Sequence, residues 1–354
     1  MSSTPSVSWF ADIGLDDRAR VGGKGASLGE LTRAEIRVPP GFVVPTSAFE
    51  TALRALDPAG EIRRTIMALS RENLSSIAAA AERIRQRIAS APLPNSLEIE
   101  IARAYGELCA GNAVLPVAVR SSATSEDSED ASFAGLQDTY LWICGEQAVL
   151  DHVRRCWASL YNTESLTYRL RLGLPEERVA MAVVVQRMVQ PRTSGVMFTR
   201  SPTTGDRSTI VIEACWGLGS CLVGGEVTPD RVVVNKVTGD TGTRTISGKA
   251  LRHVPDLARG GVRAEPVPNE MQTAPCISDD VIRELAAIGK AIERHYGRPQ
   301  DIEWALADEP SGSTLYILQS RPETVWGARD TEPVAKPTAS ALDHVFATLG
   351  HRKS

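Results

Sequence analysis

Long apolar runs, a secretion signal and paired cysteines are all missing from this sequence. No apolar run approaches the roughly eighteen residues of a membrane span. Residues 1–8 lack the charged segment and the hydrophobic segment that make up a secretion signal. The six cysteines form no C-x-x-C pair, which disfavours disulfides and a zinc site. We therefore expect a cytoplasmic protein with reduced thiols.

An excess of positive charge is missing as well. The 39 lysine and arginine residues are outnumbered by 43 aspartate and glutamate residues, and the formal net charge is −4. Proteins that bind nucleic acid or anionic membranes by their charge are usually basic, so this balance argues against both partners. The 354 residues are enough for two or three subdomains, each with its own core.

The periodicity of apolar residues predicts helices and strands in mixture. Helical spacing predicts a scaffold over residues 53–108 and further helices over 147–172 and 279–296. Ser278 is the expected N-cap of the last of these helices. Runs of β-branched residues predict strands over 182–188, 209–213 and 231–235. Trp157 lies among apolar residues at helical spacing, so we expect it in the core.

Residues 117–140 contain the first candidate for chemistry. A short apolar run, residues 117–119, places Arg120 at the end of a predicted strand, and a loop rich in Ser, Thr, Asp, Glu and Gly follows. Hydroxyls, backbone N–H groups and a guanidinium that binds two oxygens at once suit a polyphosphate. Taken alone, the stretch is equally compatible with a polar surface loop that carries one arginine.

Two glycine-rich segments resemble phosphate loops without matching the standard patterns. Lys24 lies between two glycines in residues 21–31, but the Ser or Thr that follows lysine in a Walker A loop is missing. A helix-entry loop is therefore an alternative. The segment 216–226 lacks the third glycine of the dinucleotide-binding pattern.

A predicted hairpin near residue 310 brings two oxygen ligands together. Residues 301–306 and 315–321 alternate between polar and apolar, and a turn-rich segment joins them. Pairing Leu306 with Tyr316 would set Glu303 directly across from Gln319. A carboxylate and an amide oxygen suit Mg²⁺, which takes few protein ligands and leaves its other positions to phosphate and water. A solvated cross-strand polar pair is the alternative.

Five blocks of this sequence occur in the order found in one known family. They comprise residues 21–31, 120–140, 195–199, 216–219 with 227–230, and 301–304 with 317–324. Together they resemble the ATP-binding domain shared by phosphoenolpyruvate synthase, pyruvate phosphate dikinase and rifampicin phosphotransferase. The resemblance implies an α+β fold of the ATP-grasp type. We expect subdomains over 1–190 and 191–326, and a linker with a possible partner-docking tail over 327–354.

The same resemblance implies a role for individual residues. Lys24, Arg120 and Arg321 would be catalytic, because their charges would neutralise the phosphoryl group in transfer. Glu303 and Gln319 would bind Mg²⁺. The residues expected to contact ATP are Lys24, Arg120, Gly135, Thr139, Gln186, Glu303, Gln319 and Arg321.

One position departs from the family, and one part of its machinery is missing. Relatives commonly carry Glu after Gly-Leu-Gly, where this chain has Ser220, so an acid role there is in doubt. None of the five histidines lies in the Thr-Ser/Cys-His-Ala setting of the family's phosphorylated histidine. We read them as surface or helix residues. The resemblance therefore implies a separate histidine-bearing subunit that is phosphorylated while ATP becomes AMP and phosphate.

The final acceptor of the phosphoryl group is not specified by these residues. A separate ATP-binding subunit resembles the arrangement of phenylphosphate synthase and 4-methylbenzyl phosphate synthase, which implies a phenol or an aryl alcohol such as cresol. A split phosphoenolpyruvate synthase acting on pyruvate is the first alternative. The second is a non-catalytic regulator that senses ATP, although such a regulator need not keep the Glu303–Gln319 pair.

Overall fold

The structure is a computed structural model that describes residues 6–111, 114–124, 127–128, 131–132, 138–174 and 179–326, with the backbone alone for 127–128 and 131–132. The chain divides into two compact units, Met1–Glu323 and Thr324–Ser354. Only residues 324–326 of the second unit are described, so the predicted tail over 327–354 lies outside the described residues.

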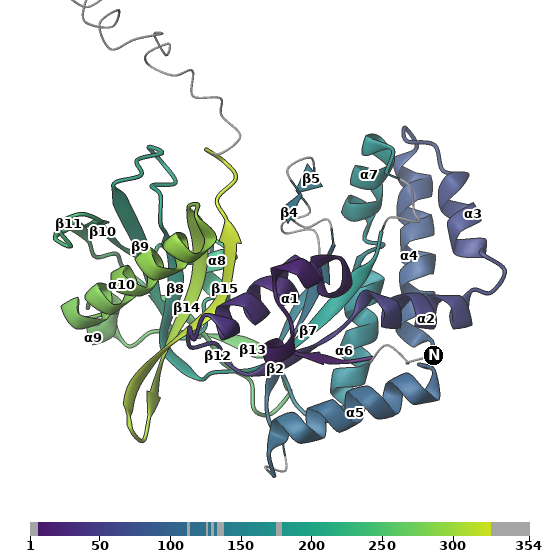
Figure 1. Cartoon of the computed structure of the whole chain (residues 1–354), viewed down its shortest axis with the longest axis horizontal. Helices are drawn as coiled ribbons and strands as arrows, with labels where there is room; N and C mark the ends of the chain where they lie inside the picture. The colour runs from purple at the N-terminus through teal and green to yellow at the C-terminus, as the bar shows by residue number, and fades with distance from the viewer. Residues whose placement is uncertain are drawn as a thin grey trace, which may run out of the picture. The chain divides into compact units, whose positions relative to one another are not determined.

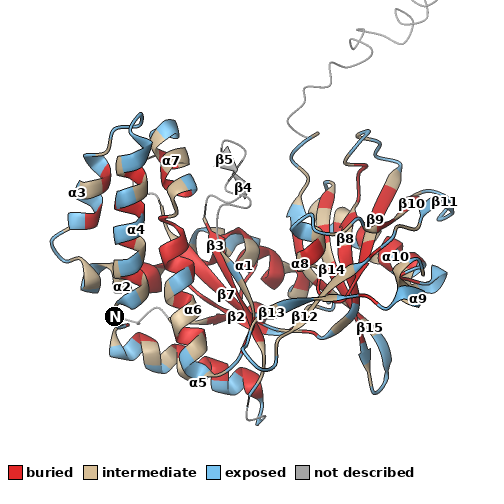
Figure 2. Cartoon of the chain, turned by 180° about the vertical axis from the view of Figure 1, so that it is seen from behind, coloured by how far each residue is buried: buried red, intermediate tan, exposed pale blue. Residues whose placement is uncertain are grey.

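The N-terminal half of the first unit contains a five-stranded antiparallel sheet, in the order β1-β2-β7-β3-β6 (Figure 1). Its strands are β1 (Ser8–Trp9), β2 (Gly41–Val44), β3 (Val117–Ala123), β6 (Thr139–Ile143) and β7 (Met181–Arg187). β3 is buried along its whole length, and β7 is buried up to its last residue (Figure 2). Burial on both faces explains why the sequence of β7 is a continuous β-branched run.

Helices pack on both faces of the first sheet. They are α1 (Arg18–Arg33), α2 (Thr46–Leu56), α3 (Glu61–Met67), α4 (Leu74–Ser90), α5 (Asn95–Cys109), α6 (Glu146–Ser159) and α7 (Thr163–Leu172). Short 3₁₀ turns, η1 (Phe10–Asp12) and η2 (Leu15–Asp17), precede α1. Trp157 of α6 is buried in the core formed with α2, α4 and α5, which confirms the prediction for this residue.

The C-terminal half contains a six-stranded antiparallel sheet, in the order β11-β10-β9-β8-β14-β15. Its strands are β8 (Pro191–Phe198), β9 (Thr209–Trp216), β10 (Asp230–Asn235), β11 (Thr241–Thr245), β14 (Gln300–Glu309) and β15 (Gly312–Pro322). Helix α10 (Asp279–Tyr296) packs its apolar side against one face, where Trp304 is fully buried. As predicted, Ser278 caps α10 by accepting from the N–H of Val281 at 3.4 Å.

Short elements complete the fold. A two-stranded hairpin, β12 (Leu251–Pro255) and β13 (Val262–Pro266), crosses between the sheets on the side seen in Figure 2. The others are β4 (Asp127–Ser128), β5 (Ala131–Ser132), α8 (Ser220–Val223) and α9 (Asn269–Gln272). With helices packed on antiparallel sheets, the predicted α+β class is confirmed.

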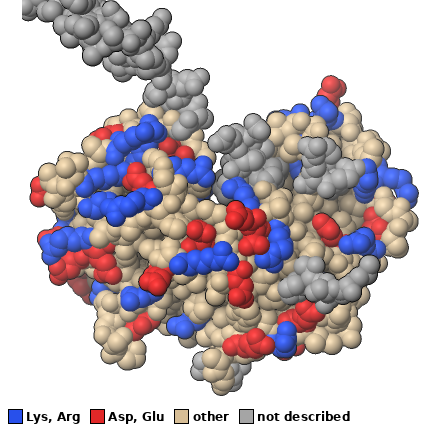
Figure 3. All heavy atoms as spheres, in the orientation of Figure 1, with Lys and Arg blue, Asp and Glu red and all other residues tan. Residues whose placement is uncertain are grey.

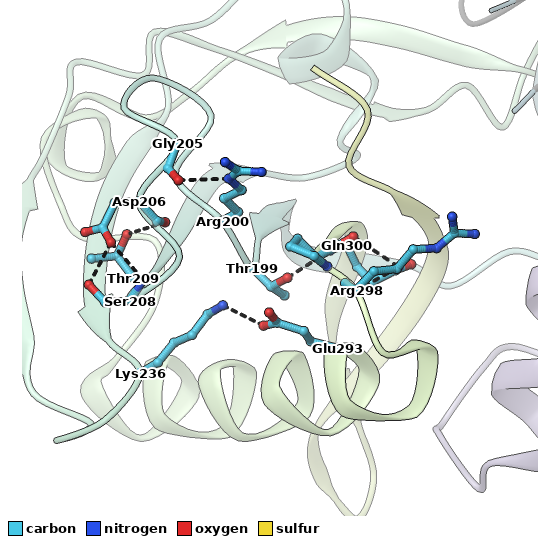
Figure 4. Close-up of polar contacts among 11 residues, drawn as sticks. Thr199, Arg200, Gly205, Asp206, Ser208, Thr209, Lys236, Glu293, Arg298 and Gln300 are labelled. Carbon is cyan, nitrogen blue, oxygen red and sulfur yellow. Dashed lines mark hydrogen bonds and ion pairs between the residues drawn. The ribbon is translucent and has the colours of Figure 1, made fainter. Parts of the chain in front are cut away.

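Helix α1 connects the two sheets. It packs on β3 and β7, and its Ser27 hydroxyl donates to the carbonyl of Ser320 in β15 at 2.6 Å. At the same end of the second sheet, polar contacts fix the strand ends (Figure 4). Thr199 and Gln300 join β8 to β14 through a backbone N–H···O bond of 2.9 Å, and Lys236 pairs with Glu293 of α10 at 2.6 Å. These contacts hold β14, and with it Glu303, in a fixed register.

Candidate functional site

A cavity of about 420 Å³ lies between the two sheets. Cavities of roughly 300–1,000 Å³ typically hold small ligands and cofactors. The first sheet contributes Arg120, Thr139 and Gln186, and the second contributes Ser194, Glu303 and Leu318. Residues 187–189, where the chain leaves β7 for β8, and the glycine-rich segment around α8 complete the walls.

Arg120 is the polar centre of this cavity. Its side chain is nearly buried, and its Nη1 donates to Gln186 Oε1 at 3.3 Å and to the carbonyl of Leu318 at 3.1 Å. Its Nη2 donates to Glu303 Oε2 at 3.1 Å and to Gln319 Oε1 at 2.5 Å. Within the described residues its buried Nε has no partner. Buried N–H groups without a partner also occur in the described core, at Trp157 and Trp304, and what distinguishes Arg120 is that its N–H belongs to a charged group that lines the cavity.

Glu303 and Gln319 face each other across β14 and β15, as predicted, but the predicted register is wrong beyond them. Leu306 pairs with Leu315 instead of Tyr316. A β-bulge between Glu303 and Trp304 accounts for the shift, because β15 contains one extra residue, Leu318. Bulges often redirect groups next to active sites, and here the carbonyl of Leu318 accepts from Arg120.

The oxygens of Glu303 and Gln319 converge on a cation, which is the property that a metal site requires. In this structure the cation is the guanidinium of Arg120. In the described part of the chain no group of three or more His, Cys, Asp or Glu residues could hold a metal. A single carboxylate with an amide oxygen still fits Mg²⁺, which keeps several waters and binds substrate phosphates.

Thr139 and Gln186 reach the cavity from either side of Arg120. Thr139 lies opposite Arg120 in the β3–β6 pairing, so both side chains point to the same face of the sheet. Gln186 is buried, and its Nε2 donates to the carbonyl of Pro39 at 3.4 Å while its Oε1 accepts from Arg120. Gln186 therefore helps to orient the guanidinium. Gly135 lies outside the described residues.

Lys24 is not among the residues that line the cavity. It follows a kink in α1, where Gly22 has φ 71° and α1 leaves helical geometry. The Ser122 hydroxyl of β3 fixes this segment, since it donates to the carbonyl of Val21 at 2.8 Å and accepts from the N–H of Gly25 at 3.1 Å. The predicted loop is thus the start of a helix, and it attaches Lys24 to the strand that carries Arg120.

Arg321 lies two residues beyond Gln319 on β15 and also does not line the cavity. Its side chain is half-exposed, and its Nε donates to Asp301 Oδ2 at 3.4 Å. Burial raises the pKa of Asp301 to about 6, Arg321 opposes the rise and Glu323 adds to it. We did not single out Asp301 from the sequence, although the alternation of its strand places it on the face of Glu303.

Ser220 lines the cavity and begins a short series of polar contacts. Its hydroxyl lies 2.8 Å from His253 Nδ1, and His253 Nε2 lies 3.3 Å from Glu226 Oε2. His253 is on β12 and its side chain is mostly buried, so the reading of it as a surface or helix residue is wrong. Ser220 is thereby linked, through His253, to the carboxylate of Glu226.

All six cysteines are free, five of them buried and Cys144 exposed. Across the described helices, none has the length and apolar character needed to cross a membrane. Both signs of charge occur over the face shown in Figure 3.

Comparisons with known proteins match the chain along most of its length. Residues 18–341 match the family described as pyruvate phosphate dikinase, AMP/ATP-binding domain. A probable phosphoenolpyruvate synthase of Staphylothermus marinus is 39% identical over 100% of this chain and 46% of its own length. A rifampicin phosphotransferase of a Streptomyces species is 43% identical over 97% of this chain and 38% of its own length.

A probable phosphoenolpyruvate synthase of Methanocaldococcus jannaschii is 40% identical over 93% of this chain and 28% of its own length. The chain therefore spans less than half the length of each of these three relatives.

Proposed function

The chain belongs to the family of pyruvate phosphate dikinase AMP/ATP-binding domains, and from this premise we propose that the cavity around Arg120 binds ATP. The observation that carries the proposal is the environment of Arg120. It is a nearly buried guanidinium with four acceptors and one unsatisfied N–H, at the point where the two sheets meet. A polyphosphate would satisfy that N–H and would match the planar fork of the arginine.

The walls of the cavity suit the two halves of a nucleotide. Leu141, Val189 and Leu218 supply apolar surface for the base. The phosphates would lie at Arg120, with Thr139 and Gly135 contributing hydroxyl and backbone contacts.

We propose that Glu303 and Gln319 hold Mg²⁺ when ATP is bound. Their oxygens already converge on a positive charge, and Arg120 would turn from them to the phosphate oxygens. When bound, the metal neutralises charge on the phosphates. Lys24 and Arg321 would add positive charge to the phosphate oxygens as the side chains rearrange around ATP.

The reaction proposed is of the dikinase type. ATP, water and the imidazole of a histidine on a separate subunit give AMP, inorganic phosphate and the phosphorylated histidine. Phosphoryl transfer depends mainly on alignment and on neutralising charge, which are the tasks that Arg120, Lys24 and Arg321 would perform. The family membership and the cationic site support this reaction, and a purely regulatory ATP sensor would not require the Glu303–Gln319 pair.

For the final acceptor we propose an aromatic hydroxyl, such as that of a phenol or an aryl alcohol. Pyruvate is the competing acceptor, and it is favoured by the names of the Staphylothermus and Methanocaldococcus relatives. The two can be separated by supplying each acceptor, together with the chain, ATP and the phosphohistidine partner, and by measuring which one is phosphorylated.

The decisive test of the transfer itself is AMP formation. The chain is incubated with ATP and Mg²⁺ in the presence and in the absence of a histidine-bearing partner. We expect AMP and a phosphorylated partner only when the partner is present. Release of ADP in place of AMP, or no turnover with any histidine-bearing partner encoded beside this chain, would contradict the proposal.

A further inference from the structure

A second cavity, of about 660 Å³, adjoins the first one and has so far no role. The two cavities share Thr139, Leu141 and Ser220. The walls of the second cavity come from β6, from α6 and from the β12–β13 hairpin with its turn. Although the chain has a net charge of −4, no acidic side chain is among the described residues that line this cavity. Its titratable nitrogen groups are Arg155, Arg259, His152 and His253.

Neither arginine of this cavity is neutralised by a neighbour. In the described residues, Arg155 and Arg259 have no hydrogen bond or ion pair from their guanidinium groups, whereas Arg154, next to Arg155, pairs with Asp151. Both arginines are exposed to solvent at the cavity wall. Two uncompensated guanidinium groups on one hollow attract anions, and the low-dielectric walls strengthen the field.

Backbone hydrogen bonds fix the conformation of the hairpin turn that carries Arg259. Asp256 Oδ1 accepts from the N–H groups of Ala258 and Arg259, both at 3.1 Å. The N–H of Gly261 donates to the carbonyl of Trp142 at 3.3 Å and ties the turn to β6. The one carboxylate of the turn is thus used by the backbone, which leaves the charge of Arg259 for another partner.

Helix α6 presents Arg155 beside His152. His152 Nδ1 lies 2.6 Å from the carbonyl of Ala148, and a carbonyl only accepts, so Nδ1 carries the proton. The imidazole packs edge-on against the ring of Tyr140, at 4.8 Å between centroids. Burial lowers the pKa of His152 and the charge of Arg155 lowers it further, so the guanidinium lies within electrostatic range of this ring.

Strand β6, which separates the two cavities, is strained at this point. Trp142 has φ 59°, a left-handed conformation that bulky residues rarely adopt. The pairing of β3 with β6 shifts by one residue between Val117 and Val119, so β6 accommodates an extra residue here. Such strain persists where the surrounding structure enforces it, and it is found most often at ligand sites.

We propose that this second cavity binds a small phosphate-type oxyanion, held by the guanidinium groups of Arg155 and Arg259. Arginine matches phosphate because its N–H groups form a planar fork that meets two oxygens. The hollow shape favours a small anion over the flat surface of a protein partner. The anion could come from free inorganic phosphate or from a phosphorylated small molecule, since both present the same group. Binding at this site does not depend on ATP in the first cavity.

The test is a calorimetric titration of the full chain with inorganic phosphate, at an ionic strength held constant with sodium chloride. We expect saturable binding of one phosphate per chain. The double variant Arg155→Gln/Arg259→Gln should bind it at least tenfold more weakly. The matched control is Arg64→Gln/Arg83→Gln. It removes two exposed arginines, on α3 and α4, that line neither cavity, and it should bind phosphate as the parent does.

Several results separate this proposal from its rivals. Equal weakening in both double variants, or binding no tighter than that of chloride, would overturn it in favour of general charge attraction. Phosphate displaced by ATP and kept by the Arg155→Gln/Arg259→Gln variant would place the anion in the first cavity and also overturn it. Unchanged phosphate binding with loss of a protein partner would assign the surface to docking instead.

The two sources of the anion are compared by titrating phenyl phosphate beside inorganic phosphate. Tighter binding of the ester identifies a phosphorylated small molecule, and tighter binding of inorganic phosphate identifies the free ion. ATP binding should be the same in the Arg155→Gln/Arg259→Gln variant and in the parent, so that failure here is distinct from failure of the proposed ATP site.

Discussion

The side chain of Arg120 joins the two sheets by hydrogen bonds. It rises from β3 of the first sheet and donates to Glu303, Gln319 and the carbonyl of Leu318 in the second. A lysine could not replace it, because an ammonium group lacks the planar fork that reaches several oxygens at once. We therefore expect Arg120 to hold the two sheets together when no ligand is bound and to bind phosphate when ATP is present.

The first prediction concerns the variant Arg120→Gln. We expect AMP formation with the histidine-bearing partner to fall at least about a hundredfold, because a charge that stabilises the transition state is removed. Turnover is measured at saturating ATP, with Arg83→Gln as the control for loss of an exposed arginine. Loss of less than threefold in Arg120→Gln would mean that the guanidinium does not act on the phosphates.

Asp301 allows a prediction on the pH dependence of stability. Burial raises its pKa in the folded protein to about 6, above the ordinary value of 3.8, so the folded state binds this proton more tightly than the unfolded state. Ionisation of Asp301 therefore lowers the free energy of unfolding as pH rises from about 4 to about 6. The loss is complete from about pH 7, where Asp301 is ionised in the folded protein as well.

The comparison is made with Asp301→Asn, which cannot titrate. Urea unfolding between about pH 4.5 and about pH 7.5 should show that the stability of the parent relative to the variant decreases with pH and then levels off above about pH 7. A difference that stays constant over this range would show that the carboxyl of Asp301 has an ordinary pKa.

Individual site residues could be predicted from the sequence to different degrees. Arg120, Thr139, Gln186, Glu303 and Gln319 do line or border one cavity, because strand alternation and the family pattern specify which face each occupies. Side chains that depend on contacts between distant segments could not be found in this way. His253 is an example, since its partners Ser220 and Glu226 lie about thirty residues earlier and meet it only in the folded chain.

Among the elements, the β14–β15 hairpin shows how a bulge changes a register. Alternation of polar residues predicts the hairpin and the Glu303–Gln319 pair, and both are found. The extra residue at Leu318 has no signal in the sequence, because a bulge depends on the neighbouring strand and on Arg120, which binds the carbonyl that the bulge exposes.

Gly22 allows a prediction about helix α1. It has a positive φ, and a Cβ atom at this position would lie 2.1 Å from the carbonyl oxygen of Ser122. Gly60 has nearly the same φ with no atom near its Cβ position, so it is a matched control. We expect Gly60→Ala to cost about 1 kcal/mol for the left-handed conformation alone.

Gly22→Ala should cost about 1–3 kcal/mol more, because the overlap with backbone cannot be relieved by a rotamer change. The free energies come from urea unfolding. The kink also places Lys24, so a larger KM for ATP should accompany the loss of stability. Equal costs for the two variants would show that the backbone of α1 at Gly22 does not pack closely against Ser122 of β3.

A buried ion pair fixes β10 to the segments that follow it. Lys249 Nζ lies 2.5 Å from Asp230 Oδ1, and both side chains are buried. The same carboxylate accepts from the N–H of Ser247 at 3.0 Å and of Cys276 at 2.8 Å. Asp230 belongs to a block that we matched to the family, and its role here is to hold the chain between β10 and α10.

Lys249→Met should therefore lower the free energy of unfolding by about 3 kcal/mol or more, since it leaves a buried carboxylate without its counter-ion. Lys236→Met is the control, because the Lys236–Glu293 pair is partly exposed and its loss should cost about 1 kcal/mol or less. Chemical denaturation of both variants measures the two costs. Similar values would contradict the structural role of Lys249.

At the scale of the whole molecule, the proposed ATP site lies between the two sheets of the first unit. The α+β class and most of the predicted strands and helices are found, because hydrophobic periodicity is a local property of the sequence. The order of strands within each sheet, the connection of the sheets by α1 and the second cavity are not local properties. They arise from contacts between segments up to about 290 residues apart, such as that of Ser27 with Ser320.

We propose that ATP binds between the sheets with Mg²⁺ at Glu303 and Gln319. This proposal is tested most directly by titrating the chain with a non-hydrolysable ATP analogue, with Mg²⁺ and then with a chelator. We predict that Mg²⁺ tightens binding at least tenfold in the parent and in the control Glu107→Gln, and less than threefold in Glu303→Gln. An equal effect of Mg²⁺ in all three proteins would contradict the claim.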